Sequence, residues 1–232
     1  MKETGSNGSS AIAQATERYA AGDYRSALDI LVHATVGEDA YLDLAYLLGL
    51  CYARLERFDE ALLYLEQVVT QGLEEARTFQ CRMALALVYS ATGRSKLAEY
   101  ELKKLVESSS ETSQVCAALG HANWKQGRVT DSLAWYEKSL ALDPENPTAL
   151  NGYGYVLASS GRELEKALAC CRKALDDDPE NPAYADSIGW VYFKLGRMEE
   201  AGRYLHAAAE LLGDSDESIE HVDVYEKALD QQ

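Results

Sequence analysis

Apolar residues recur at helical spacing along most of the chain, and the pattern is clearest between Pro182 and Leu212. After Pro182, large apolar side chains follow one another every three to four residues as far as Leu195, and Gly196 then interrupts the pattern. A second amphipathic stretch runs from there to Leu212. Asn181 and Pro182 are typical of a helix start, because Asn accepts from free backbone N–H groups and Pro lacks one. The stretch predicts two helices, which need similar neighbours to bury their apolar faces.

The same helix pair recurs along the chain at a nearly constant interval. The pentapeptide Asp-Pro-Glu-Asn-Pro occurs at 143–147 and again at 178–182, where its first Pro ends one helix and its Asn-Pro begins the next. A small residue marks one position of each first helix at intervals of 37, 34, 34 and 35 residues: Gly49, Ala86, Gly120, Gly154 and Gly189. We therefore predict an all-α chain with repeats over about 8–41, 42–75, 79–112, 113–146, 147–181 and 182–215.

A period of about 34 residues that combines Leu-Gly, a later Tyr, then Ala, a large apolar residue and Pro is similar to the tetratricopeptide repeat (TPR) pattern. The chain resembles this family from end to end. The segments GYGYVLASSGRELEKAL and DSIGWVYFKLGRMEEA look more like bacterial TPR proteins than eukaryotic co-chaperones. The resemblance implies a right-handed α-α superhelix, or solenoid, of about six helix pairs in one domain.

The two ends depart from the repeat pattern. Residues 1–10 are small and polar, which predicts a flexible leader before a solenoid over 11–213. Residues 214–232 begin with acidic residues and then carry the apolar stripe Ile219, Val222, Tyr225 and Leu229, which predicts a capping helix. Inside the array, Glu56 stands at a turn where Gly is usual, residues 76–78 are an insertion, and the fifth repeat holds one extra residue in its inner turn.

Composition narrows the classes of partner and compartment. The chain has 38 acidic and 22 basic residues, a net charge of −16, and no basic stripe, so we expect no nucleic-acid partner. No apolar run is long enough to span a bilayer. The five cysteines are odd in number, irregularly spaced and form no CxxC motif. A disulfide framework is therefore not expected, which favours a reducing compartment. We expect a cytoplasmic protein; the alternative is a periplasmic lipoprotein in which residues 1–10 are the tether of a processed N-terminus.

Catalytic motifs are missing from the sequence. The four histidines are widely spaced, and there is no HExxH, GxSxG, P-loop or dinucleotide fingerprint. Cys170 and Cys171 are adjacent, so on a helix their side chains point about 100° apart and do not converge on a metal. Cys171 is expected to be a buried thiol, with a redox or metal role as the alternative. We expect no enzyme activity, no metal and no cofactor.

The family resemblance implies that the first helix of each pair lines a concave groove. Ten residues at groove positions are candidates for contacting a peptide: Tyr46, Leu50, His121, Trp124, Asn151, Tyr155, Asp186, Trp190, Phe193 and Lys194. Four of them are aromatic and lie in repeats four to six, beside polar groups, which is typical of a protein-recognition surface. The Lys, Asn and Arg set with which chaperone-binding TPR families clamp a carboxylate does not form.

These observations favour a non-catalytic scaffold or adaptor that binds a segment of a partner protein in the concave groove. One alternative is that the groove aromatics pack against neighbouring helices or against a C-terminal segment of the same chain. Another is a self-associating structural TPR protein, a homo-oligomer, in an envelope, secretion or motility assembly. The self-association hypothesis rests on the apolar start of the imperfect first repeat, which could pair with another copy of the chain.

Overall fold

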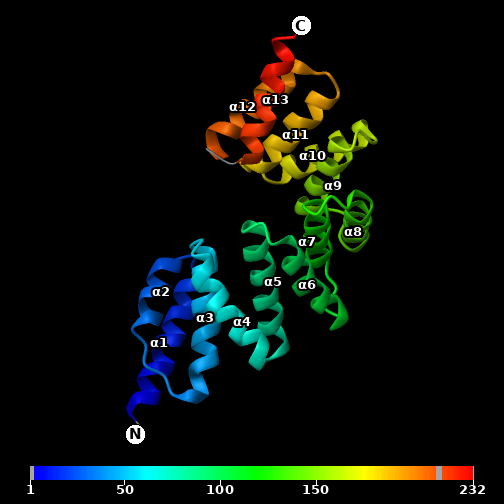
Figure 1. Ribbon diagram of the computed structural model, residues 1–232. Helices are drawn as coiled ribbons and strands as arrows, with labels where there is room; N and C mark the ends of the chain where they lie inside the picture. The colour runs from blue at the N-terminus through cyan, green and yellow to red at the C-terminus, as the bar shows by residue number, and fades with distance from the viewer. Residues whose placement is uncertain (1–2, 213–215, 232) are drawn as a thin grey trace. The chain divides into compact units, whose positions relative to one another are not determined.

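The computed structural model describes residues 3–212 and 216–231 (Figure 1). Within these ranges the chain is helical without strands, and no helix is both long and apolar enough to cross a lipid bilayer. The chain divides into two compact units, Met1–Ser110 and Glu111–Gln232. This differs from the single domain that we expected. The division follows Ser108 and Ser109, which are exposed and stand where other repeats carry Pro.

The first unit consists of three helix pairs, each packed against the next. Its elements are α1 (Glu3–Ala20), α2 (Tyr24–Val32), the 3₁₀ turn η1 (Glu38–Ala40), α3 (Tyr41–Arg54), α4 (Phe58–Gln71), α5 (Glu75–Ala91) and α6 (Ser95–Glu107). The second helix of each pair packs against the first helix of the next pair, α2 on α3 and α4 on α5. Fully buried leucines, among them Leu31, Leu65 and Leu85, form its core.

The second unit consists of three more pairs and a last helix. Its elements are α7 (Ser113–Trp124), α8 (Val129–Leu142), α9 (Pro147–Ser159), α10 (Leu164–Asp177), α11 (Pro182–Lys194), α12 (Met198–Leu212) and α13 (Asp216–Leu229). The first helices α7, α9 and α11 contact one another in sequence, and α13 contacts α12 and α11. The predicted all-α array of six helix pairs is confirmed, and a helix lies where we expected the capping helix.

The repeated Asn-Pro pairs begin helices as the sequence predicts. The side-chain oxygen of Asn146 accepts a hydrogen bond from the backbone N–H of Ala149 at 2.9 Å, and that of Asn181 accepts from Ala183 at 3.1 Å. The following Pro occupies the first helical turn in both cases. These caps fix where α9 and α11 begin, and therefore which of their residues face α13.

The turns inside the pairs follow the predicted departures. Gly196 joins α11 to α12 with φ +74°, and the corresponding Glu56 adopts φ 58° although it carries a side chain. In the fifth repeat, Gly161 (φ 67°) and Glu163 (φ 42°) are both left-handed, which accommodates the extra residue. The insertion 76–78 lies within α5, which has 17 residues where α3 has 14.

The small residue in each first helix lets the second helix approach closely. A Cβ added at Gly189 would lie 2.9 Å from Cγ of Leu205, a side chain that is fully buried in α12. Because a side chain at residue 189 would push α12 away, glycine here sets the spacing of the pair.

The predicted leader is the clearest difference at the N-terminus, because α1 already begins at Glu3. Residues 3–10 are therefore helical, where we expected a flexible segment. Gly8 is buried, and a Cβ there would lie 2.6 Å from the carbonyl oxygen of Thr35. The small residues that suggested flexibility instead allow α1 to pass close to the backbone after α2.

Candidate functional site

The first helices of the second unit carry four aromatic side chains on one face. Trp124 of α7 meets Tyr155 of α9 edge to face, with ring centroids 5.8 Å apart, and Trp190 stacks on Phe193 within α11 at 5.2 Å. The Lys194 ammonium lies 4.4 Å from the centroid of the Trp190 ring. We call Trp124, Tyr155, Trp190 and Phe193 the aromatic cluster.

Helix α13 inserts an imidazole into this cluster. The ring of His221 stacks on Trp190 with centroids 4.2 Å apart and is only 4% exposed. Its Nδ1 lies 2.8 Å from Oδ2 of Asp186, and its Nε2 lies 3.2 Å from the Tyr155 hydroxyl. Since a carboxylate accepts, Nδ1–H donates to Asp186, and Nε2 forms the hydrogen bond with the Tyr155 hydroxyl. Both ring nitrogens are satisfied while the ring faces are covered.

One helical turn later, Tyr225 provides a second anchor between α11 and α12. Its side chain is buried, and its ring meets Phe193 at 6.5 Å and His206 at 5.7 Å, both edge to face. A Cβ added at Gly202 of α12 would lie 2.7 Å from Cζ of Tyr225. Glycine at 202 therefore leaves the space that the tyrosine ring fills.

Hydrogen bonds connect the first helices beneath α13. The indole N–H of Trp190 donates to the Ser159 hydroxyl at 3.0 Å, and the amide nitrogen of Asn151 donates to the Ser187 hydroxyl at 3.1 Å. Two acceptor atoms, Oδ1 of Asn151 and Oδ1 of Asp186, are buried without a donor in the described part of the chain. An unpaired buried acceptor is unfavourable, so this face has unused capacity for N–H or O–H donors.

The structure brings eight of the ten predicted site residues onto α7, α9 and α11. His121 is half-buried one turn before Trp124. The other two belong to the first unit. Leu50 is 7% exposed and lies in the core of that unit, so its assignment to a groove surface was wrong. Tyr46 is half-buried, its hydroxyl hydrogen-bonds to Gln80, and burial raises its pKa.

Of the two buried residues through which α13 binds, the sequence analysis placed Tyr225 on the predicted stripe but missed His221. The predicted stripe on this helix is only partly correct, because Ile219 is 44% and Leu229 is 42% exposed, whereas His221 is buried beside Tyr225. The available signal was the spacing, since an imidazole and a phenol four residues apart share one helix face. His221 was missed because the predicted stripe included apolar residues and Tyr225 only.

The cysteine pair shows no features of a reactive site. Cys171 is fully buried and Cys170 half-buried, and burial raises the pKa of both thiols. A raised pKa disfavours the thiolate, which is the nucleophile and the metal ligand. Among the described residues, no group of three or more His, Cys, Asp or Glu side chains could hold a metal ion.

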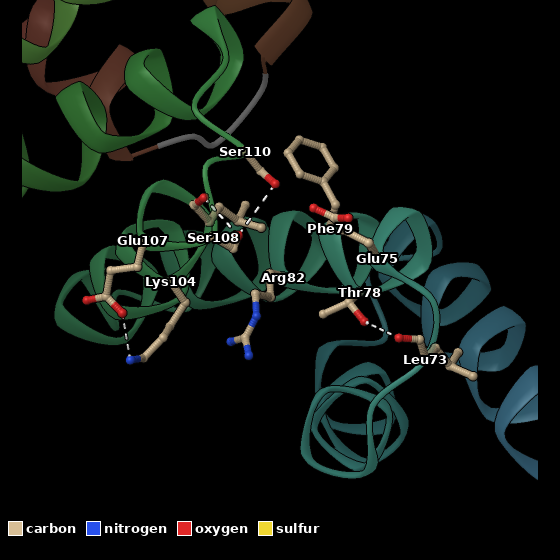
Figure 2. A pocket seen from close by; sticks show the side chains of 10 residues that line it. Leu73, Glu75, Thr78, Phe79, Arg82, Lys104, Glu107, Ser108 and Ser110 are labelled. Atoms are coloured by element: carbon tan, nitrogen blue, oxygen red, sulfur yellow. Dashed lines mark hydrogen bonds and ion pairs between the residues drawn. The ribbon is translucent and has the colours of Figure 1, made fainter.

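The first unit holds a pocket of 530 Å³ that opens between α5 and α6 (Figure 2). Its two cations are already paired. The Lys104 ammonium lies 2.8 Å from the Glu107 carboxylate, and Arg82 pairs with the largely buried Glu101. A ligand would have to displace these carboxylates, so the aromatic cluster is the stronger candidate.

Structures of other proteins share this architecture. A tetratricopeptide repeat protein from Parabacteroides merdae is similar with a TM-score of 0.69 and 14% identity, over 96% of this chain and 93% of that one. TTC0263, a TPR protein of Thermus thermophilus, has a TM-score of 0.62 and 21% identity, over 81% and 98% of the two chains. At these identities the likeness concerns the fold alone.

Sequence comparison gives a partial relative and a family. The TPR repeat-containing thioredoxin TTL4 of Arabidopsis thaliana is 29% identical over 110 residues, which is 47% of this chain but only 16% of that protein. The family model for the tetratricopeptide repeat matches residues 12–77, 83–147, 117–182 and 161–216. These repeats support a protein–protein interaction scaffold. Because the model matches cover most of the sequence, the chain belongs to the tetratricopeptide repeat family.

Proposed function

We propose that the first-helix face of the second unit, formed by α7, α9 and α11, binds a segment of a partner protein through the aromatic cluster. The observation that carries this proposal is α13. The face already holds a helix by ring stacking on Trp190 and by hydrogen bonds to Asp186 and Tyr155. A surface with this chemistry suits an amphipathic segment from another protein.

The aromatic side chains of the face differ in their solvent exposure, which indicates that α13 covers only part of it. Trp124 and Tyr155 are half-buried, whereas Trp190 is 9% exposed beneath α13. Trp and Tyr dominate the binding energy of many interfaces because they bury large apolar areas and keep a polar group. A partner would therefore engage Trp124 and Tyr155 first. The proposed role is non-catalytic.

The test compares two tryptophans of the same repeat. Trp124 belongs to the face, and Trp135 lies on the second helix α8, where it is half-buried below Lys138. We expect Trp124→Ala to weaken partner capture by about 30-fold, the effect of removing an anchor worth roughly 2 kcal/mol. Trp135→Ala is the matched control and should capture the partner normally.

Capture is measured by crosslinking in native lysate followed by mass spectrometry, with circular dichroism to show that both variants remain helical. A protein recovered with wild type and Trp135→Ala but lost with Trp124→Ala supports the proposal. Equal recovery with all three proteins would place the interface elsewhere and overturn it.

A further inference from the structure

Two buried side chains, with the partly buried Val222 and Val224 beside them, attach α13 to the rest of the second unit. Among the described side chains of this helix, only His221 and Tyr225 are buried, and they lie one turn apart on the same face. His221 meets the first helices α9 and α11, while Tyr225 reaches α12. An imidazole and an aromatic ring at this spacing are therefore the main features by which the face holds α13.

The attachment of α13 is limited in extent. Its outer apolar residues Ile219 and Leu229 stay substantially exposed. Isolated helices of 14 residues are marginally stable in water, so α13 depends on these anchors to remain folded. Segments with few buried contacts open locally more readily than the core. α13 is thus suited to leave the face while α7 to α12 stay folded.

The first-helix face also has buried acceptors without donors among the described residues. Oδ1 of Asp186 and Oδ1 of Asn151 lie buried in the face without a donor among the described residues, although Asp186 already accepts from His221. A ligand that repeats the two anchors and adds a donor to these oxygens would bind better than α13 does. α13 therefore serves as a model of the ligand, and the two acceptors give an external ligand a way to bind more tightly than α13 does.

We propose that α13 is an internal substitute for the partner, and that the partner segment is an amphipathic helix with an imidazole four residues before an aromatic side chain. This inference rests on the proposed function and names the class of partner for the same face. The partner helix displaces α13, places its imidazole on Trp190 between Asp186 and Tyr155, and places its aromatic ring over Gly202. The apparent affinity for the partner is the affinity of the open site multiplied by the fraction of molecules in which α13 has left the face.

The test uses the full chain and a synthetic peptide of residues 216–231, labelled for fluorescence anisotropy. His221→Ala combined with Tyr225→Ala in the protein removes both internal anchors and leaves every residue of the face unchanged. The peptide should bind this open variant at least about tenfold more tightly than it binds wild type. A matched peptide with Ala in place of its His and Tyr should not bind.

A further variant of the same chain tests where the peptide binds. The open variant with the further change Gly202→Val should lose peptide binding, because a side chain at residue 202 occupies the space of the aromatic ring. Equal binding of the peptide to wild type and to the open variant would overturn the inference, as would failure of the open variant to bind it. If Trp124→Ala still abolishes partner capture in that case, the proposed function stands and only the helix-exchange inference fails.

Discussion

Removing the ring of Tyr225 should detach α13 without unfolding the second unit. The buried ring makes edge contacts with Phe193 and His206 and fills the space over Gly202. Burial of a side chain of this size contributes about 2 kcal/mol, and each aromatic contact about 1 kcal/mol. Tyr225→Ala therefore removes about 4 kcal/mol from a helix whose only other buried anchor among its described side chains is His221.

This loss concerns contacts that α13 itself makes, so the expected result is local. Amide hydrogen exchange followed by mass spectrometry should show α13 exchanging at least about tenfold faster, since each 1.4 kcal/mol is worth a factor of ten. The amides of α9 and α11 should keep their protection. Tyr225→Phe retains the ring and is the control, with exchange close to wild type.

Two outcomes would refute the reasoning. Unchanged protection of α13 in Tyr225→Ala would mean that the ring does not hold the helix. Loss of protection throughout α7 to α12 would mean that α13 is an integral part of the core, and that it cannot leave the first-helix face on its own.

Three further predictions concern packing, backbone and thiols. Leu205→Ala should reduce the free energy of unfolding by roughly 2–5 kcal/mol in urea denaturation, because this fully buried side chain packs against Gly189; a loss below 1 kcal/mol would contradict the packing. Glu56→Gly should stabilise by up to about 1 kcal/mol and raise Tm, since glycine adopts φ 58° without strain; a lower Tm would contradict this. Burial raises the pKa of Cys51 to about 11 and that of Cys81 to about 12, so both thiols stay protonated at pH 8. Both should therefore react slowly with a disulfide reagent until the protein is denatured. Rapid labelling of the native protein would contradict this prediction.

Much of the fold follows from local signals in the sequence. The Asn-Pro pairs before α9 and α11 act through side-chain hydrogen bonds a few residues away, and the glycine of the first helix acts within its own pair. Such short-range interactions repeat with the sequence, so their period predicts the helix pairs. The prediction of a flexible leader was wrong because it relied on local composition. Gly8 instead allows a close contact with Thr35, which belongs to another segment of the chain.

The candidate site was predictable only in part. The aromatic residues of α7, α9 and α11 occupy two positions of their repeats, one and four residues after the small residue, and these two positions identify the face. His221 contacts Asp186 and Tyr155, which lie 35 and 66 residues away, and nothing in its own segment indicates this. Leu50 occupies a groove position by repeat numbering, yet its neighbours bury it. Exposure depends on the adjoining helices, which the repeat pattern does not specify.

The central claim is that one face of the second unit exchanges an internal helix for an external one. It is tested most directly by hydrogen exchange on wild-type protein saturated with an isotopically heavy 216–231 peptide, whose fragments differ in mass from those of the protein. We expect α13 to lose protection, α9 and α11 to retain theirs, and the peptide to become protected. Persistent protection of α13 with the peptide bound would contradict it.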